Sequence, residues 1–382
     1  MRNSRCLILV IGLTGLGSSL LPAADRTIGI GTLRDKIQGD WVGHMAGVDW
    51  GGPTEFSHQG TIIPVSSVPA WTPDMINGGF GQDDLYVEMP FVNAMNDNGV
   101  NCDWTKFGDC FRGFSPQLWH ANMQGRQNLQ DGYQVPDSGH YSINPHCDDI
   151  DWQIESNPCG IMAPGQPNVA AELAWRAGHT MNYGDGVYGG VFIAAMHAEA
   201  YFATNINQMI EVGRQAIPVG SKYRQTIEDV IAWKAQGNTW QQTWQLLQDK
   251  WGGTDRCPDG VNNPFNIDAK LNGAYVLMGL LYGNGDFESS TRIAMQCGQD
   301  SDCNPGSAAA VLGTYLGFSG IPGKFTSGLN LSSTFSSTSY TVNDVMAISE
   351  RMARQILALT GGSSSGSGSN ETWTIPWSAA TP

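Results

Sequence analysis

Apolar residues recur at intervals of three and four over most of this chain, and few stretches alternate as β-strands do. This spacing gathers apolar side chains on one face of a helix. We expect a first helix to about residue 47, with Thr32 and Asp35 in a capping box at its start. Eight later segments combine the same spacing with helix-forming residues: 169–177, 190–204, 222–236, 239–251, 268–283, 286–297, 306–318 and 342–359. The pattern predicts a mainly helical protein.

Composition and charge narrow the class of protein. Of the 382 residues, 41% are hydrophobic and only 14% are charged, a balance too apolar for a disordered chain. The length suffices for one large domain or two ordinary ones, each with a sizeable core. The net charge of -15 repels a phosphate backbone, which argues against a nucleic-acid partner.

Two regions depart from the helical pattern. From 96 to 166 the chain is rich in Asn, Gly, Pro and Asp, and no apolar periodicity lasts beyond two turns. Its many aromatic residues argue against disorder, so we expect a long aromatic-rich loop region that packs over the helical body as a wall or lid. The run Gly361–Ser369 is typical of a Gly/Ser linker, which a short tail with Trp373 and Trp377 follows.

The first 24 residues have the features of a secretory signal peptide. Arg2 and Arg5 precede a stretch without charges that ends in small residues before Asp25. The alternative is a membrane anchor, but glycines and serines dilute the apolar run. We therefore predict an exported protein, periplasmic or extracellular, with no membrane association after cleavage. The predicted division is 1–24 signal peptide, 25–360 helical domain, and 361–382 linker and tail.

Cysteine usage is compatible with export. Seven cysteines remain after residue 24, and the pairs Cys102/Cys110 and Cys147/Cys159 are close enough in sequence to form local disulfides. Cys303 could be a metal ligand, a free thiol or half of a disulfide with Cys297. Sequence alone does not decide among these states.

Two acidic clusters are the main candidates for chemistry. One contains Asp83 and Asp84 after Gln82, and the other contains Asp300 and Asp302, just before a helix predicted from about residue 306 with Asn304 as its N-cap. Each alone is typical of a carboxylate that complements a helix dipole. If the fold brings them together, four carboxylates repel one another unless cations bind between them. Such oxygen ligands favour Mg²⁺, with Mn²⁺ and Ca²⁺ as alternatives.

A glycine-rich helix precedes the third candidate. Gly39, Gly43 and Gly47 lie four residues apart, so this face can approach another helix closely. The Gly-Gly-Pro turn that follows presents Glu55, a candidate general base.

Together these patches resemble the ADP-ribosylglycohydrolase family. The matching motifs, in order, are Gly43 to Glu55, Gln82-Asp83-Asp84, Gly285-Asp286-Phe287-Glu288, and Gly298 to Cys303 followed by a small-residue helix. The segments Asp149–Glu155 and Gly186–Gly190 are similar to one branch of that family. The resemblance spans residues 33 to about 322 and implies an all-α fold, a compact multi-helix domain with a binuclear magnesium site.

The resemblance also implies roles for single residues. The family's metal ligands correspond to Asp83, Asp84, Asp300 and Asp302, and its acidic residue near the scissile bond corresponds to Glu55. We expect Glu55, Asp84 or Asp302 to act as the base. Gln82 and Cys303 stand where the family has threonines, and we retain both as candidate ligands.

Three further residues are candidate substrate contacts. Asn182 stands where many family members have a pocket histidine, and His179 lies one helical turn earlier. Tyr188 belongs to the Gly186–Gly190 motif.

The resemblance implies metal-assisted hydrolysis of an N- or O-glycosidic bond in an ADP-ribosyl or related ribosyl substrate, small or protein-linked. Two alternatives stay open. The same fold could cleave another nucleoside or glycoside, or the protein could be a non-catalytic, secreted sugar- or nucleotide-binding protein. The sequence does not indicate an oligomeric state.

Overall fold

Two helices in backbone contact form the centre of the molecule. The computed structural model describes residues 25–254, 257–260 and 263–382. Helix α1 (Ile30–Gly51) packs along helix α15 (Cys303–Leu316). A Cβ atom on Gly39 would lie 2.2 Å from the carbonyl oxygen of Gly313, and one on Gly43 would lie 2.4 Å from that of Ala309. The close approach predicted for this glycine face is therefore confirmed, and only glycine permits it.

The other long helices surround this pair. Every segment predicted as a helix contains one, and the all-α class is confirmed. The helices are α8 (Pro167–Gly178), α9 (Asp185–Ala200), α10 (Ile206–Gln215), α11 (Lys222–Ala235), α12 (Trp240–Trp251), α13 (Ala269–Gly283), α14 (Phe287–Gln296) and α16 (Val342–Leu359). The sequence analysis missed α10. It also misplaced two starts, because α1 begins after Gly29 without a side-chain cap, and α15 begins after Asp302 rather than Asn304.

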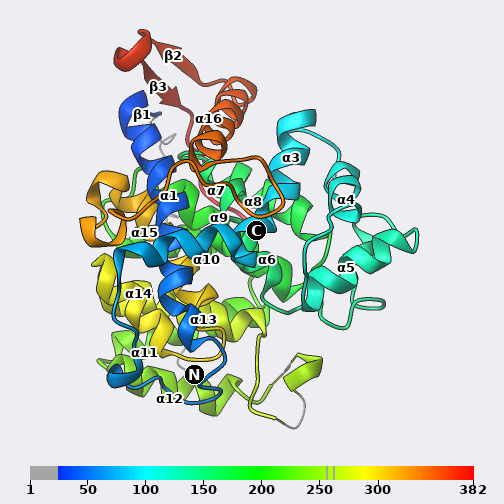
Figure 1. Ribbon diagram of the computed structural model, residues 1–382, viewed down its shortest axis with the longest axis vertical. Coiled ribbons are helices and arrows are strands. Elements are labelled where there is room, and N and C mark those ends of the chain that lie inside the picture. The colour runs from blue at the N-terminus through cyan, green and yellow to red at the C-terminus, as the bar shows by residue number, and fades with distance from the viewer. Residues whose placement is uncertain (1–24, 255–256, 261–262) are drawn as a thin grey trace, which may run out of the picture.

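The segment 96–166 is more regular than predicted. After the end of α3 (Glu88–Asn98) it contains α4 (Thr105–Arg112), α5 (His120–Gln130), α6 (Asp151–Glu155) and α7 (Asn157–Ile161). The segment predicted as a long loop is therefore interrupted by four helices, which are too short for a sustained apolar period. Aromatic contacts attach them to the body: the ring centroid of Phe91 lies 5.6 Å from that of Phe111 and 4.9 Å from that of Trp152. Figure 1 shows α4 and α5 at one side of the helical body.

The C-terminal segment 361–382 is not a free linker and tail. Strands β2 (Ser363–Ser365) and β3 (Thr372–Ile375) join β1 (Arg26–Gly29) in an antiparallel sheet of order β1-β3-β2. Arg26 pairs with Ile375 across β1 and β3. The Trp373 and Ile375 side chains are fully buried, and this burial anchors the segment. The small sheet lies at the opposite end of the molecule from α11 and α12 (Figure 1).

The seven cysteines beyond residue 24 are free thiols in the structure. The predicted disulfides Cys102/Cys110 and Cys147/Cys159 are therefore not formed, and neither is the alternative Cys297/Cys303. The predicted signal peptide lies outside the described residues. Within the described part of the chain, every helix is too short or too polar to cross a bilayer.

Candidate functional site

A cavity of about 500 Å³ opens beside the N-terminal end of α15. Its lining combines carboxylates with aromatic and aliphatic side chains. The lining residues are Glu55, Phe56, Asp83, Trp119, His120, Asn122, Ile150, Asp151, Ile154, Asp259, Phe265, Ile267, Asp300 and Cys303. This volume suits a small-molecule ligand.

The central helix pair determines where the acidic groups lie. Where α1 ends, a Cβ atom on Gly51 would lie 2.1 Å from the carbonyl oxygen of Ser301, so the chain after α1 touches the loop before α15. Two contacts extend this junction. The amide of Phe56 donates to the carbonyl of Gln299 at 3.0 Å, and the hydroxyl oxygens of Thr54 and Ser301 lie 2.9 Å apart. Glu55 is thereby brought beside the second acidic cluster.

The first acidic cluster comes from a short helix, α2 (Asp83–Tyr86). Potential ligand atoms of Asp84, Asp302 and Cys303 all lie within 4.8 Å of one another, and so do those of Glu55, Asp300 and Asp302. Asp302 belongs to both groups. The structure thus brings together both acidic clusters and the candidate base, while Asp83 lines the cavity beside them. We call Glu55, Asp83, Asp84, Asp300, Asp302 and Cys303 the acidic floor.

The electrostatics of the acidic floor suit a divalent cation. One oxygen each of Asp300 and Asp302 is buried without a protein partner. Burial and the charges of Asp84 and Asp300 raise the pKa of Asp83 to about 8, and burial together with Asp84 raises the pKa of Asp300 to about 7. Burial also raises the pKa of Asp302 well above its usual range. A cation would satisfy the free oxygens and relieve the repulsion, so these residues fit Mg²⁺.

The two residues that replace threonines lie differently. The Cys303 thiol donates to Oδ2 of Asp84 at 3.3 Å, and burial keeps its pKa well above the usual value, so it occupies the floor as a neutral thiol. Burial raises the pKa of Asp49 to about 7, and the neighbouring Gln82 side chain opposes this rise. The Asp49 carboxylate accepts a hydrogen bond from the amide of Gly79.

Two buried residues behind Asp84 escaped the sequence analysis. His44 Nε2 lies 3.4 Å from Asp84 Oδ1, and His44 Nδ1 lies 3.5 Å from Glu88 Oε1. Burial alone would lower the pKa of His44, but the neighbouring carboxylates of Asp84 and Glu88 outweigh burial and raise it to about 10. The imidazolium therefore orients Asp84 from behind. His44 lies in the glycine-rich helix that the sequence analysis had singled out, and this position could have identified it as a candidate site residue.

The opposite wall comes from the segment 96–166. Asp151 Oδ1 accepts a hydrogen bond from the amide of Asn122 at 3.0 Å, and the Asn122 side chain donates to Glu155. Burial raises the pKa of Asp151 to about 6. At the rim, the rings of Phe56 and Phe265 lie 4.9 Å apart, and the Trp119 side chain is 55% exposed. The Asp149–Glu155 motif could have predicted this wall from the sequence. The contribution of α5 could not be predicted, because the helix is too short to show a clear apolar period.

The structure does not place the three candidate substrate contacts in this cavity. Asn182 is fully buried, where its Oδ1 accepts from the amide of Trp152 and its Nδ2 donates to the carbonyls of Cys147 and Asp149. His179 packs against the rings of Trp104 and Trp175. Their arrangement supports the local backbone rather than a ligand.

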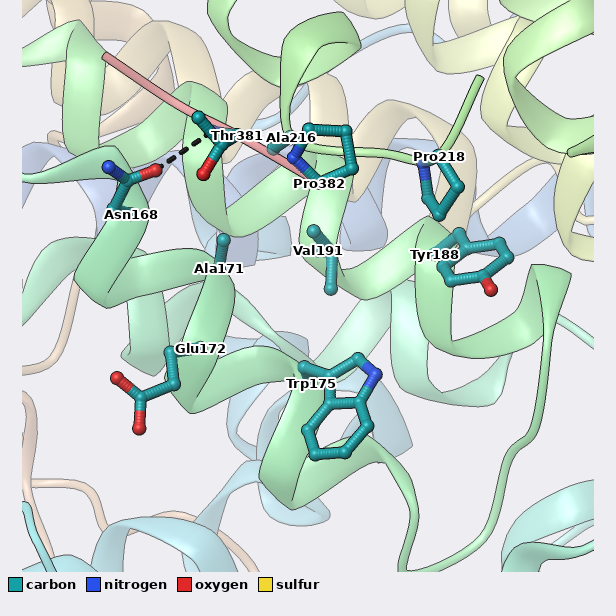
Figure 2. Close-up of a pocket in the computed structure, with 10 residues that line it drawn as sticks. All are labelled: Asn168, Ala171, Glu172, Trp175, Tyr188, Val191, Ala216, Pro218, Thr381 and Pro382. Atoms are coloured by element: carbon teal, nitrogen blue, oxygen red, sulfur yellow. Dashed lines mark hydrogen bonds between the residues drawn. The ribbon is translucent and has the colours of Figure 1, made fainter. Parts of the chain in front are cut away.

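Tyr188 lines a different cavity of similar volume (Figure 2). That cavity is lined mainly by apolar side chains with one carboxylate, Glu172, and the amide of Thr381 closes part of it by donating to Asn168 Oδ1 at 2.9 Å. The acidic residues that the sequence analysis singled out converge at the first cavity instead.

Comparisons with known proteins agree with the fold. The family model described as ADP-ribosylglycohydrolase matches residues 31–362. A solved structure titled "ADP-ribosylglycohydrolase-related protein complex" matches with a TM-score of 0.59 and 16% sequence identity, over 86% of this chain and all of that one. At this identity the likeness shows the fold alone. A search of curated proteins finds no match.

Proposed function

Because the chain belongs to the ADP-ribosylglycohydrolase family, we propose that it is a metal-dependent hydrolase that cleaves the N- or O-glycosidic bond of an ADP-ribosyl or related ribosyl substrate. The observation that carries the proposal is the acidic floor. Carboxylates from three separate parts of the chain converge there, and two of their buried oxygens have no protein partner.

The residues of the floor would have two roles, metal binding and proton transfer. Asp84, Asp300 and Asp302, with Asp83 beside them, would hold the cations. When bound, Mg²⁺ would orient the sugar hydroxyls and polarise the glycosidic bond. Glu55 is the carboxylate of the floor most open to the cavity. Burial and the charge of Asp84 raise its pKa, which makes it a better acceptor for a proton of the attacking water.

The rest of the cavity would bind the substrate. Phe56, Phe265 and Trp119 offer ring faces on which a base or a sugar can stack. The net negative charge of the site disfavours a pyrophosphate unless cations are bound, so we expect substrate affinity to require metal.

The direct test is isothermal titration of ADP-ribose into chelator-stripped protein, with and without Mg²⁺. Binding that requires Mg²⁺, followed by release of ADP-ribose from ADP-ribosylated substrates, supports the proposal. Catalytic activity that survives exhaustive chelation would overturn it. Binding without turnover of any ribosyl substrate would favour the non-catalytic alternative.

A second candidate keeps the chemistry but changes the substrate. Gln82 and Cys303 stand where the family has threonines, and Cys303 places a thiol beside Asp84. These departures favour a hydrolase for another nucleoside or glycoside on the same fold. Metal-dependent turnover of such a compound, without ADP-ribose binding, would identify it.

We also propose that the protein is exported, on the basis of residues 1–24. N-terminal sequencing of protein from the periplasmic and extracellular fractions should begin at about residue 25. A mature protein that retains Met1 would contradict export by cleavage.

A further inference from the structure

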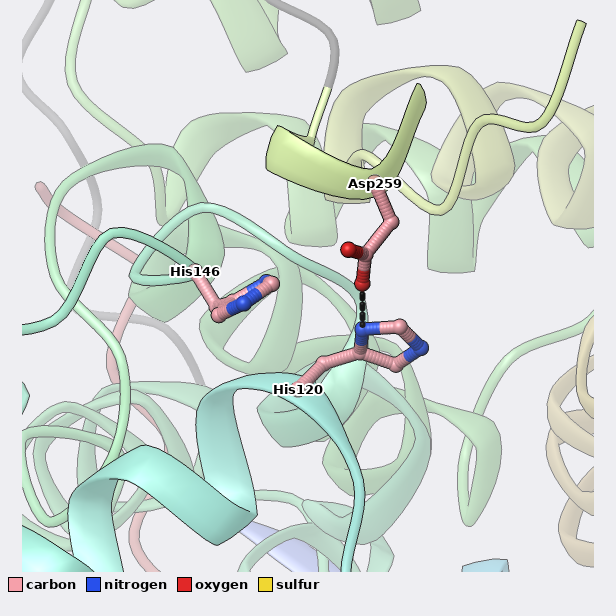
Figure 3. A group of neighbouring side chains, drawn as sticks. All are labelled: His120, His146 and Asp259. Carbon is pink, nitrogen blue, oxygen red and sulfur yellow. Dashed lines mark ion pairs between the residues drawn. The ribbon is translucent and has the colours of Figure 1, made fainter. Parts of the chain in front are cut away.

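Two histidines and a carboxylate meet at the mouth of the cavity. His120 is the first residue of α5, His146 precedes α6, and Asp259 belongs to the short helix Pro258–Gly260. Figure 3 shows the Asp259 carboxylate directed at the His120 ring, with the His146 ring beside it. Potential ligand atoms of all three lie within 4.8 Å of one another. His120 Nδ1 and Asp259 Oδ2 are 3.1 Å apart, near the separation of about 3.3 Å between ligands of a tetrahedral zinc ion.

A second observation orients one of the histidines. His146 Nδ1 lies 2.7 Å from Oδ2 of Asp149, a residue with no exposed surface whose other carboxylate oxygen has no partner. With Nδ1 bonded to the carboxylate, Nε2 of His146 is left to bind a metal. Histidine ligands in metalloproteins usually have such a carboxylate or carbonyl behind them, which fixes the ring and its tautomer. Burial raises the pKa of Asp149, and a cation on the far nitrogen of His146 would favour its carboxylate form.

The charge states agree with metal binding. Burial lowers the pKa of His120 below its usual value despite Asp259. Burial and the neighbouring His120 lower the pKa of His146, against the opposing charges of Asp151, Asp259 and Asp148. Both rings are therefore neutral at pH 7 and have a lone pair to offer.

We propose that His120, His146 and Asp259 form a second metal site, for Zn²⁺ or a similar transition metal, separate from the acidic floor. Two imidazoles and one carboxylate suit zinc, whereas the oxygen ligands of the floor suit Mg²⁺. Three protein ligands leave at least one position open. Because His120 and Asp259 line the cavity, we expect that position to open toward it.

Equilibrium dialysis of the chelator-stripped full chain tests the proposal. Zn²⁺ is added in the presence of excess Mg²⁺, and bound zinc is counted per protein for the wild type and for the double variant His120→Ala, His146→Ala. His140→Ala is the matched control, because His140 lies in the same segment but bonds Ser142 instead of the cluster. Co²⁺ is a second probe, since its visible spectrum reports nitrogen ligands directly.

The wild type and His140→Ala should bind one zinc ion more tightly than the double variant, by 100-fold or more. Asp302→Ala, which damages the acidic floor, should keep this zinc ion. Equal zinc binding by the wild type and the double variant overturns the proposal. Loss of the ion in Asp302→Ala, or in Cys303→Ser, also overturns it, because the zinc would then belong to the acidic floor.

Two further points keep the test decisive. If the double variant does not fold, as judged by circular dichroism, His146→Gln takes its place, because the amide retains a hydrogen-bonding group toward Asp149. The experiment measures metal content rather than turnover, so its result does not depend on whether the proposed hydrolase activity exists.

Discussion

The two sides of the cavity are built in different ways. The acidic floor rests on α1 and α15, whose backbones touch at Gly39, Gly43 and Gly47. The opposite wall consists of short helices held by side chains, through aromatic contacts and the hydrogen bonds of Asn122. A backbone junction holds repelling carboxylates together with little freedom to move apart. A wall held by side chains can change its lining without changing the junction. We therefore propose that Mg²⁺ binds at the floor and that the wall selects the substrate.

The largest expected effect of any single substitution is at Asp302. Asp302→Ala removes a ligand shared by both groups of the floor, so Mg²⁺ affinity and turnover should fall by more than about 100-fold, the upper range for residues that only support metal ligands. The fold should survive, because the residue contributes little to the core. Calorimetric Mg²⁺ titration and circular dichroism measure the two effects. Loss of the helical signal would instead give Asp302 a structural role.

The floor should also respond strongly to pH. Mg²⁺ must displace protons from Asp83 and Asp300, whose pKa values are raised to about 8 and about 7. Below pH 7 the apparent Mg²⁺ affinity should therefore fall by up to about 100-fold per pH unit, two protons being displaced. Titration at several pH values, in buffers of different ionisation enthalpy, counts the released protons. Affinity unchanged between pH 5.5 and 8 would contradict these pKa values.

The stability of the metal-free protein should show the opposite trend. The folded pKa values of these carboxyls lie above their unfolded values near 3.8, so the folded state binds more protons between about pH 4 and 8. Their contribution to stability is present at the low end of this window and is lost as the pH rises through 7 and 8. The melting temperature of the chelated protein should therefore fall over that range relative to Asp83→Asn, and Mg²⁺ should restore it.

A pair of glycine substitutions tests the backbone junction without touching the ligands. In Gly43→Ala the new methyl group meets the carbonyl of Ala309, so the free energy of unfolding should fall by about 1–3 kcal/mol. The control is Gly31→Ala on the same helix, where the added Cβ meets nothing within 4 Å and should stabilise by about 0.4–1 kcal/mol. Urea denaturation measures both. Equal effects would show that the close approach is not needed.

The smallest expected effect is at the rim of the wall. Trp119→Ala should weaken substrate binding by about 1 kcal/mol, at the low end for a base stacked on an aromatic ring because the side chain is half exposed. We expect a higher KM with kcat unchanged, since the metal ligands are untouched. A matched Trp175→Ala variant, at the other cavity, should leave both constants unchanged. A fall in kcat for Trp119→Ala alone would move this residue into the catalytic step.

Local sequence patterns predicted the helical body. The acidic floor was predicted from local patterns together with the family resemblance. Long amphipathic helices reveal themselves by their period, and a glycine repeated every fourth residue indicates close packing whatever the partner is. The acidic clusters could be listed from the sequence, and the resemblance of their order to a known family indicated their convergence. Cys303 lies at the floor, as the resemblance implied. The role of Gln82 as a metal ligand stays a prediction.

The sequence by itself determined most of the long helices, the glycine face and the identity of the acidic residues, because each follows from neighbours a few positions apart. Only the tertiary structure decided which surfaces meet. It brought His120, His146 and Asp259 together across more than a hundred residues, left Asn182 and His179 outside the cavity, and paired the ends of the chain in one sheet. These contacts join segments too short to carry a period of their own, and their positions follow from the packing of the whole core.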